Sequence, residues 1–128
     1  MTEIERILDQ LKRAYEGEAW HGPSVREALN GVTAAQAHAR PLANTHSIWE
    51  LVQHIAVWED VGRRRLTGDR AQIAISSPED WPPPGDTSES AWEKAKDAYQ
   101  PFGHTPGRFL PCYSFMGKTL GTLSLRTA

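Results

Sequence analysis

The sequence contains only one cysteine, Cys112, so it can form neither an internal disulfide nor a cysteine-based zinc knuckle. Long apolar runs are also missing, because no stretch approaches the roughly 20 apolar residues that a membrane-spanning helix needs. The N-terminal segment, MTEIERILDQLKRAY, is charged throughout and lacks the apolar centre of a signal peptide. We therefore expect a cytoplasmic protein that is not inserted in a membrane.

Dense positive charge is scarce as well. The 14 Lys and Arg side chains are outnumbered by 16 Asp and Glu, which gives a net charge of -2 with neutral histidines. The densest basic run, RRR at 63–65, falls at the end of a predicted helix, where cations complement the helix dipole. Binding to a phosphate backbone requires a clustered basic face, so we expect no nucleic-acid partner. The sequence also has no glycine-rich phosphate loop and no Ser-His-Asp pattern.

Apolar periodicity and capping residues predict an all-α chain. Capping boxes, in which a Ser or Thr side chain and a Glu or Gln three residues later bond each other's backbone, begin at Thr33, Ser47 and Ser90. The predicted helices cover residues 3–16, 24–29, a short segment from 33 that ends before Pro41, 47–67, and 90–99.

The longest predicted helix, 47–67, ends at a glycine stop, Gly68. Its apolar residues form one stripe, made of Ile48, Leu51, Val52, Ile55, Trp58 and Gly62. His54 lies roughly 90° from the centre of that stripe, beside Trp58, at a position that faces a groove of a helical bundle.

The two remaining segments have no helical pattern. Residues 69–89 are rich in proline, and we expect this crossover to be ordered because Trp81 gains by docking on the bundle. Residues 101–128 contain no Asp or Glu and carry +3, whereas residues 1–100 carry 11 basic and 16 acidic side chains, net -5. We therefore divide the chain into a helical region, 1–100, and an irregular tail, 101–128.

Four segments resemble the DinB-like superfamily of bacterial helical bundles. They are EAWHGPS at 18–24, GVTAAQA at 31–37 followed by RP at 40–41, HSIWELVQHIAVWE at 46–59, and EDWP at 79–82. The resemblance covers roughly residues 4–99. It implies an up-down helical bundle, which is incomplete here: three main helices and an irregular tail.

The resemblance also implies a divalent-metal site. Family members commonly hold a metal ion such as zinc, nickel or iron through three histidines, one on the second helix and two on the fourth. His54 matches the second-helix ligand, and His21 matches a histidine of this subgroup. The fourth-helix pair has no counterpart, since the only later histidine, His104, lies in a predicted turn. From the residues alone, His54 is more typical of a hydrogen-bonded packing residue than of a ligand, and His21 is more typical of a structural cap.

Three functions follow as hypotheses. The first is a DinB-like protein with an incomplete metal site and no robust catalysis. The second is a metal-dependent transferase or hydrolase for a small thiol-linked substrate, built from His54, His21 and a group of a partner subunit, with a metal-bound water as the reactive group. The third is a helical interaction module without chemistry.

The tail itself raises two further hypotheses. Its acid-free composition and its lack of helical periodicity suggest that an altered reading frame or a truncation of the gene after about Tyr99 replaced the closing helix with an unrelated tail. A bundle that lacks a helix exposes apolar stripes, so we expect either a homodimer or partial coverage of the gap by residues 109–116.

Overall fold

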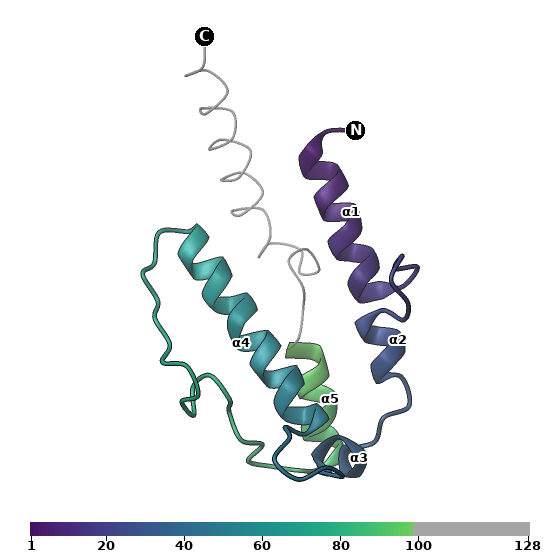
Figure 1. Cartoon of the computed structure of the whole chain (residues 1–128), viewed down its shortest axis with the longest axis vertical. Coiled ribbons are helices and arrows are strands. Elements are labelled where there is room, and N and C mark those ends of the chain that lie inside the picture. Colours follow the sequence, from purple (N-terminus) through teal and green to yellow (C-terminus); the bar gives the residue numbers. More distant parts are fainter. Residues whose placement is uncertain (99–128) are drawn as a thin grey trace.

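The computed structural model describes residues 1–98, which form five α-helices and no strand (Figure 1). The helices are α1 (Glu3–Glu16), α2 (Val25–Leu29), α3 (Ala34–His38), α4 (Ile48–Leu66) and α5 (Glu89–Ala98). The predicted all-α fold is confirmed. The predictions for His104, for Cys112 and for the 101–128 tail lie outside the described residues.

Most helix ends follow from local capping chemistry. At the start of α4, the Glu50 backbone N–H donates to the Ser47 hydroxyl at 3.2 Å, and the Ser47 N–H donates to the Glu50 carboxylate at 2.8 Å. The box at Thr33 and Gln36 forms in the same way. At the end of α4, Gly68 has a φ of 95°, and the N–H of Asp69 reaches back to the carbonyl of Arg64 at 3.0 Å. These bonds satisfy backbone groups that a helix end leaves without partners.

The predicted N-terminal cap of the last helix, Ser90, is wrong. Ser88, and not Ser90, caps α5, because its hydroxyl accepts from the Ala91 N–H at 3.3 Å. The earlier start brings Glu89 into the first turn, where its carboxylate accepts from the Ala34 N–H at 2.9 Å. A contact between two distant helix ends therefore decides between two serines that could each serve as a cap.

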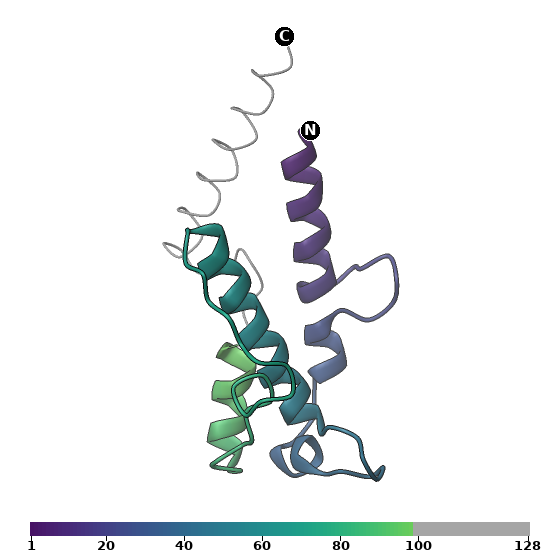
Figure 2. The same ribbon diagram turned by 60° about the vertical axis from the view of Figure 1, so that its left-hand side comes forward.

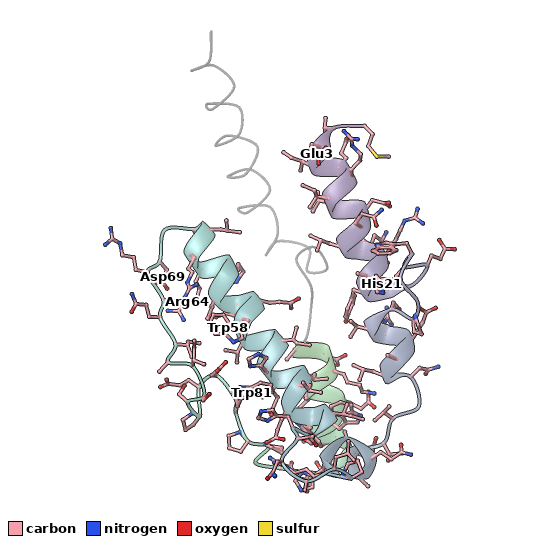
Figure 3. All side chains as sticks on the ribbon, in the orientation of Figure 1. Glu3, His21, Trp58, Arg64, Asp69 and Trp81 are labelled. Atoms are coloured by element: carbon pink, nitrogen blue, oxygen red, sulfur yellow. The ribbon has the colours of Figure 1, made fainter. Side chains whose placement is uncertain are left out.

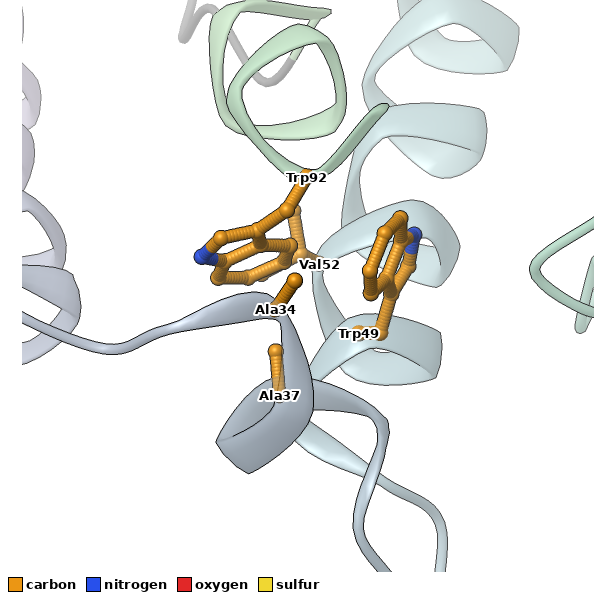
Figure 4. Packing of buried hydrophobic residues seen from close by; sticks show 5 residues of the cluster. All are labelled: Ala34, Ala37, Trp49, Val52 and Trp92. Carbon is orange, nitrogen blue, oxygen red and sulfur yellow. The ribbon is translucent and has the colours of Figure 1, made fainter. Parts of the chain in front are cut away.

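Two tryptophans form the centre of the core (Figure 4). The rings of Trp49 on α4 and Trp92 on α5 lie 5.1 Å apart, and the small side chains of Ala34 and Ala37 let α3 approach them. The Trp92 indole N–H donates to the Val32 carbonyl at 2.7 Å, so its polar atom is satisfied although the side chain is fully buried.

This packing fixes the arrangement of the helices. Trp49 and Trp92 both lie near the start of their helices, so α4 and α5 run side by side in the same direction, with α3 beneath their first turns (Figures 1 and 2). The crossover returns the chain along α4 to make this possible, and α1 with α2 occupies the other side. Within residues 1–98, no helix combines the length and the apolar character that a membrane span requires.

The apolar stripe of α4 is mostly not buried. Val52 is covered, but Ile48, Leu51 and Ile55 keep 38–45% of their surface exposed. The buried face of α4 lies instead at Trp49 and Val52, toward α3 and α5. Among residues 1–98, no helix covers these three exposed aliphatic side chains.

Trp92→Ala tests the core. The substitution should lower the free energy of unfolding by about 3–5 kcal/mol, because it empties a fully buried site in the core. Urea unfolding provides the measurement. Trp20→Ala is a matched control, since Trp20 is 86% exposed and its loss should change stability by about 0.5 kcal/mol or less. Equal effects of the two substitutions would contradict this description of the core.

Candidate functional site

The crossover lies on the side of α4 that carries His54 and Trp58, one turn apart (Figure 3). Here Asp80 returns to α4 as one of the few buried charged side chains of the described chain. Its carboxylate accepts from the Ser76 N–H at 2.7 Å and from the Trp58 indole N–H at 2.7 Å, and it lies 3.0 Å from Nδ1 of His54. Three donors thus compensate for the loss of water around this charge.

The same hydrogen bonds determine the ionisation of Asp80. The Ser76 N–H first, and then the Trp58 indole and His54, hold the pKa of Asp80 below its ordinary value despite its burial. The loop is shaped to allow this: Ser76 adopts a left-handed φ of 64°, and the Ser77 hydroxyl accepts from the Asp80 N–H at 3.2 Å. Asp80 is therefore a fixed carboxylate at neutral pH.

His54 is oriented by Asp80. Its Nδ1 lies 2.8 Å from the Asp80 carbonyl oxygen and 3.0 Å from the carboxylate. Both partners are acceptors, so Nδ1 carries the hydrogen and the neutral ring keeps a lone pair on Nε2. A carboxylate bonded to the far nitrogen of an imidazole is the usual support of a histidine that binds a metal through its other nitrogen.

Trp81 lies between two imidazoles. Its ring stacks on His54 at 3.8 Å and 8°, and on His46 at 3.5 Å and 4°. The docking of Trp81 on the bundle is therefore confirmed, and the stack fixes the plane of the His54 ring. The stacking role of His46 could not be predicted from the sequence, because no local pattern connects this residue to the crossover.

A family model described as the DinB superfamily matches residues 19–102. The chain belongs to the DinB superfamily. No curated protein and no solved structure matches the chain. The matched segment contains α2 to α5 with both His54 and the crossover, and it begins after α1.

The second histidine suggested by the DinB resemblance lies elsewhere. His21 is exposed at the connection between α1 and α2, where its ring meets the edge of Trp20 at 5.7 Å. Figure 3 shows His21 on the opposite side of the molecule from Trp81, the residue on which His54 stacks. The structure does not bring the two histidines together.

The metal site that the resemblance implies would need several donor side chains in one place. Among residues 1–98, no group of three His, Cys, Asp or Glu side chains is arranged to hold a metal ion. A catalytic zinc commonly has three protein ligands and one open position. The described residues supply one well-supported imidazole, so they do not fit a complete metal centre.

A second titratable group lies on another face of α4. Burial raises the pKa of Glu59 to about 7. Burial also raises the pKa of Tyr15 on α1, because its side chain packs against the same core cluster as Ala56 of α4 and Ala95 of α5. Five positions along α4 turn Glu59 roughly 140° away from His54, so the two do not form one site.

The basic run at 63–65 has partners within the chain. Arg63 pairs with Asp60, Arg64 bonds Asp69 at 2.7 Å, and Arg65 donates to a backbone carbonyl of the crossover at 3.0 Å. These contacts occupy the guanidinium groups at the end of α4.

Asp80→Asn tests the anchor of the crossover. The NH2 group of the asparagine would then face the Ser76 N–H, so two donors would meet without an acceptor between them. The midpoint of thermal unfolding at pH 7 should therefore fall by about 5–10 °C. Glu79→Gln, at the exposed neighbouring position, is the control.

The pH dependence of the same variant gives a second check. The folded-state pKa of Asp80 lies below its ordinary value of 3.8. Its stabilising effect is therefore present above pH 3.8 and lost as the pH falls through the lowered value. The gap between wild type and Asp80→Asn should shrink in acid, and a gap that stays constant would refute this role.

Glu59→Gln should stabilise the protein, whereas Asp80→Asn should destabilise it. The folded-state pKa of about 7 exceeds the ordinary 4.5, so folding becomes less favourable as the pH rises from 4.5 to 7. Removing the charge should raise the unfolding midpoint at pH 8 by about 3–5 °C and change it little at pH 5. Differential scanning calorimetry at the two pH values measures this, and an equal change at both would contradict it.

Proposed function

We propose that this DinB-superfamily chain keeps one metal-ligand histidine, His54, in a ligand-ready orientation and binds a divalent cation weakly, without robust catalysis. The observation that carries the proposal is the contact between Nδ1 of His54 and Asp80, at 2.8 Å to the carbonyl and 3.0 Å to the carboxylate. This contact leaves Nε2 as the nitrogen with the lone pair.

The support around His54 is of the kind that metal-binding histidines receive. Its Nδ1 meets a buried carboxylate that is itself held by Trp58 and Ser76. Trp81 adds a stacked ring that restrains rotation. Such an outer shell keeps an imidazole basic and correctly turned for a metal.

The number of ligands limits what His54 can do. Zinc, nickel and iron all accept imidazole nitrogen, but a reactive metal-bound water requires a cation held in fixed geometry by several protein groups. One imidazole leaves the cation free to turn and to dissociate. A transferase or hydrolase acting on a thiol-linked substrate would need further ligands from a partner subunit or from outside residues 1–98.

Metal titration of the full chain tests the proposal. If a structural zinc site gains about 10–16 kcal/mol from four ligands, one ligand corresponds to a Kd on the order of millimolar. NMR of the histidine rings during addition of Zn²⁺ should show a shift at His54 in that range. His54→Ala should remove the response of the neighbouring Trp81 ring, whereas the matched control His21→Ala should preserve it.

Two results would refute the proposal. Stoichiometric metal that survives purification and disappears in His54→Ala would establish a complete centre, as the transferase hypothesis requires. An unchanged His54 ring at millimolar Zn²⁺ would remove the metal role and favour a helical interaction module.

A further inference from the structure

His46 takes no part in the metal chemistry proposed above, yet its ring is firmly placed. The residue directly precedes the Ser47 cap of α4, and 44% of its side-chain surface is exposed. Its imidazole nevertheless lies flat on the indole of Trp81, at 3.5 Å and 4°. The stack of Trp81 on His54 has nearly the same geometry, at 3.8 Å and 8°. The indole is therefore held between two parallel imidazoles, one just before α4 and one about two turns into it.

The connection between α3 and α4 determines where His46 lies. Arg40 donates to the Thr45 carbonyl at 3.3 Å and so holds the backbone directly before His46. The same guanidinium pairs with the buried carboxylate of Glu50, which also accepts from the Ser47 N–H at 2.8 Å. Nδ1 of His46 lies 3.9 Å from that carboxylate, which is too long for a hydrogen bond. The ring is thus placed by its fixed backbone and by its stack on Trp81.

His46 and His54 cannot share a metal ion in this arrangement. A metal ion lies in the plane of the imidazole that binds it, about 2.0–2.1 Å from the nitrogen for zinc. The two ring planes are nearly parallel, and the indole of Trp81 lies between them, so their lone pairs do not converge. Any contribution of His46 to the His54 site therefore passes through Trp81.

An indole supported on one face can slide or tilt away from its partner, because the attraction between stacked rings is weakly directional. The Trp81 backbone N–H donates to the Ser77 carbonyl at 3.0 Å, which places the main chain of the crossover but not the indole ring. His46 closes the second face of the indole. The plane that Trp81 offers to His54 is confined as a result.

We propose that His46 is a positioning residue of the His54 site, which acts through Trp81 to hold the His54 ring in its ligand-ready plane. Asp80 decides which nitrogen of His54 carries the hydrogen, and the pair of His46 and Trp81 restrains the rotation of the ring. The purpose of this orientation rests on the metal binding proposed above, whereas the orientation itself can be measured in metal-free protein.

NMR of the histidine rings in the metal-free full chain measures the orientation directly. The indole shifts the ring protons of a stacked imidazole upfield, and His46→Ala should reduce this shift at His54 by about half, since one of the two stacks that confine the indole is lost. His46→Phe should restore the shift, because a phenyl ring can stack on Trp81 in the same way. His38→Ala, at an exposed histidine of α3, is the matched control and should leave His54 unchanged.

A double-mutant cycle separates positioning from a general effect on stability. His46→Ala should weaken Zn²⁺ binding at His54 by about threefold, which lies in the range that one aromatic pair supplies. In a Trp81→Ala background the same substitution should have no further effect on Zn²⁺ binding or on the His54 ring signals, because the link is already removed. A residue that only stabilises the fold would have equal effects in both backgrounds.

Three results would overturn the role of His46. They are unchanged His54 ring signals in His46→Ala, no recovery in His46→Phe, and equal effects of His46→Ala with and without Trp81. Failure of the metal proposal has a different signature. Zn²⁺ would then leave the His54 ring unchanged in every variant, while the metal-free signals of wild type and His46→Ala would still differ.

Discussion

The buried carboxylate of Asp80 is the interaction on which the crossover face of the molecule depends. The crossover is too rich in proline to form a backbone ladder, so side chains must attach it to α4. Asp80 does this by accepting from the indole of Trp58 on the helix and from the backbone of Ser76 in the loop. A charge removed from water is tolerated only when it is hydrogen-bonded in this way, and the same bonds set the orientation of His54.

Features fixed within a few residues could be predicted from the sequence. The caps at Thr33 and Ser47 and the stop at Gly68 are satisfied by groups three to five positions away, so a local reading identifies them. The start of α5 could not be read in this way, because Ser88 and Ser90 are both competent caps. The long-range bond from Glu89 to α3 distinguishes them.

In the candidate site, too, only the features fixed by neighbouring residues could be predicted from the sequence. Helical periodicity placed His54 at the edge of the apolar stripe beside Trp58, and the two rings do meet edge to face at 6.3 Å. The carboxylate that turns His54, and the stack of Trp81 on His46, depend on how the crossover folds back, which no periodic pattern encodes. The signal available was the EDWP segment, whose aspartate and tryptophan are the two anchoring residues.

The orientation of His54 does not require a metal. Asp80 is already satisfied by Ser76 and Trp58, and it secures the crossover whether or not a cation is bound. Its third acceptor contact fixes His54 as a by-product of folding. The crossover can therefore hold this imidazole in one orientation without a bound ion, because the contacts that secure the crossover also orient the ring. The orientation of His54 is therefore explained by folding alone, and tight binding of a metal would require further donor groups beside the α4–crossover contact.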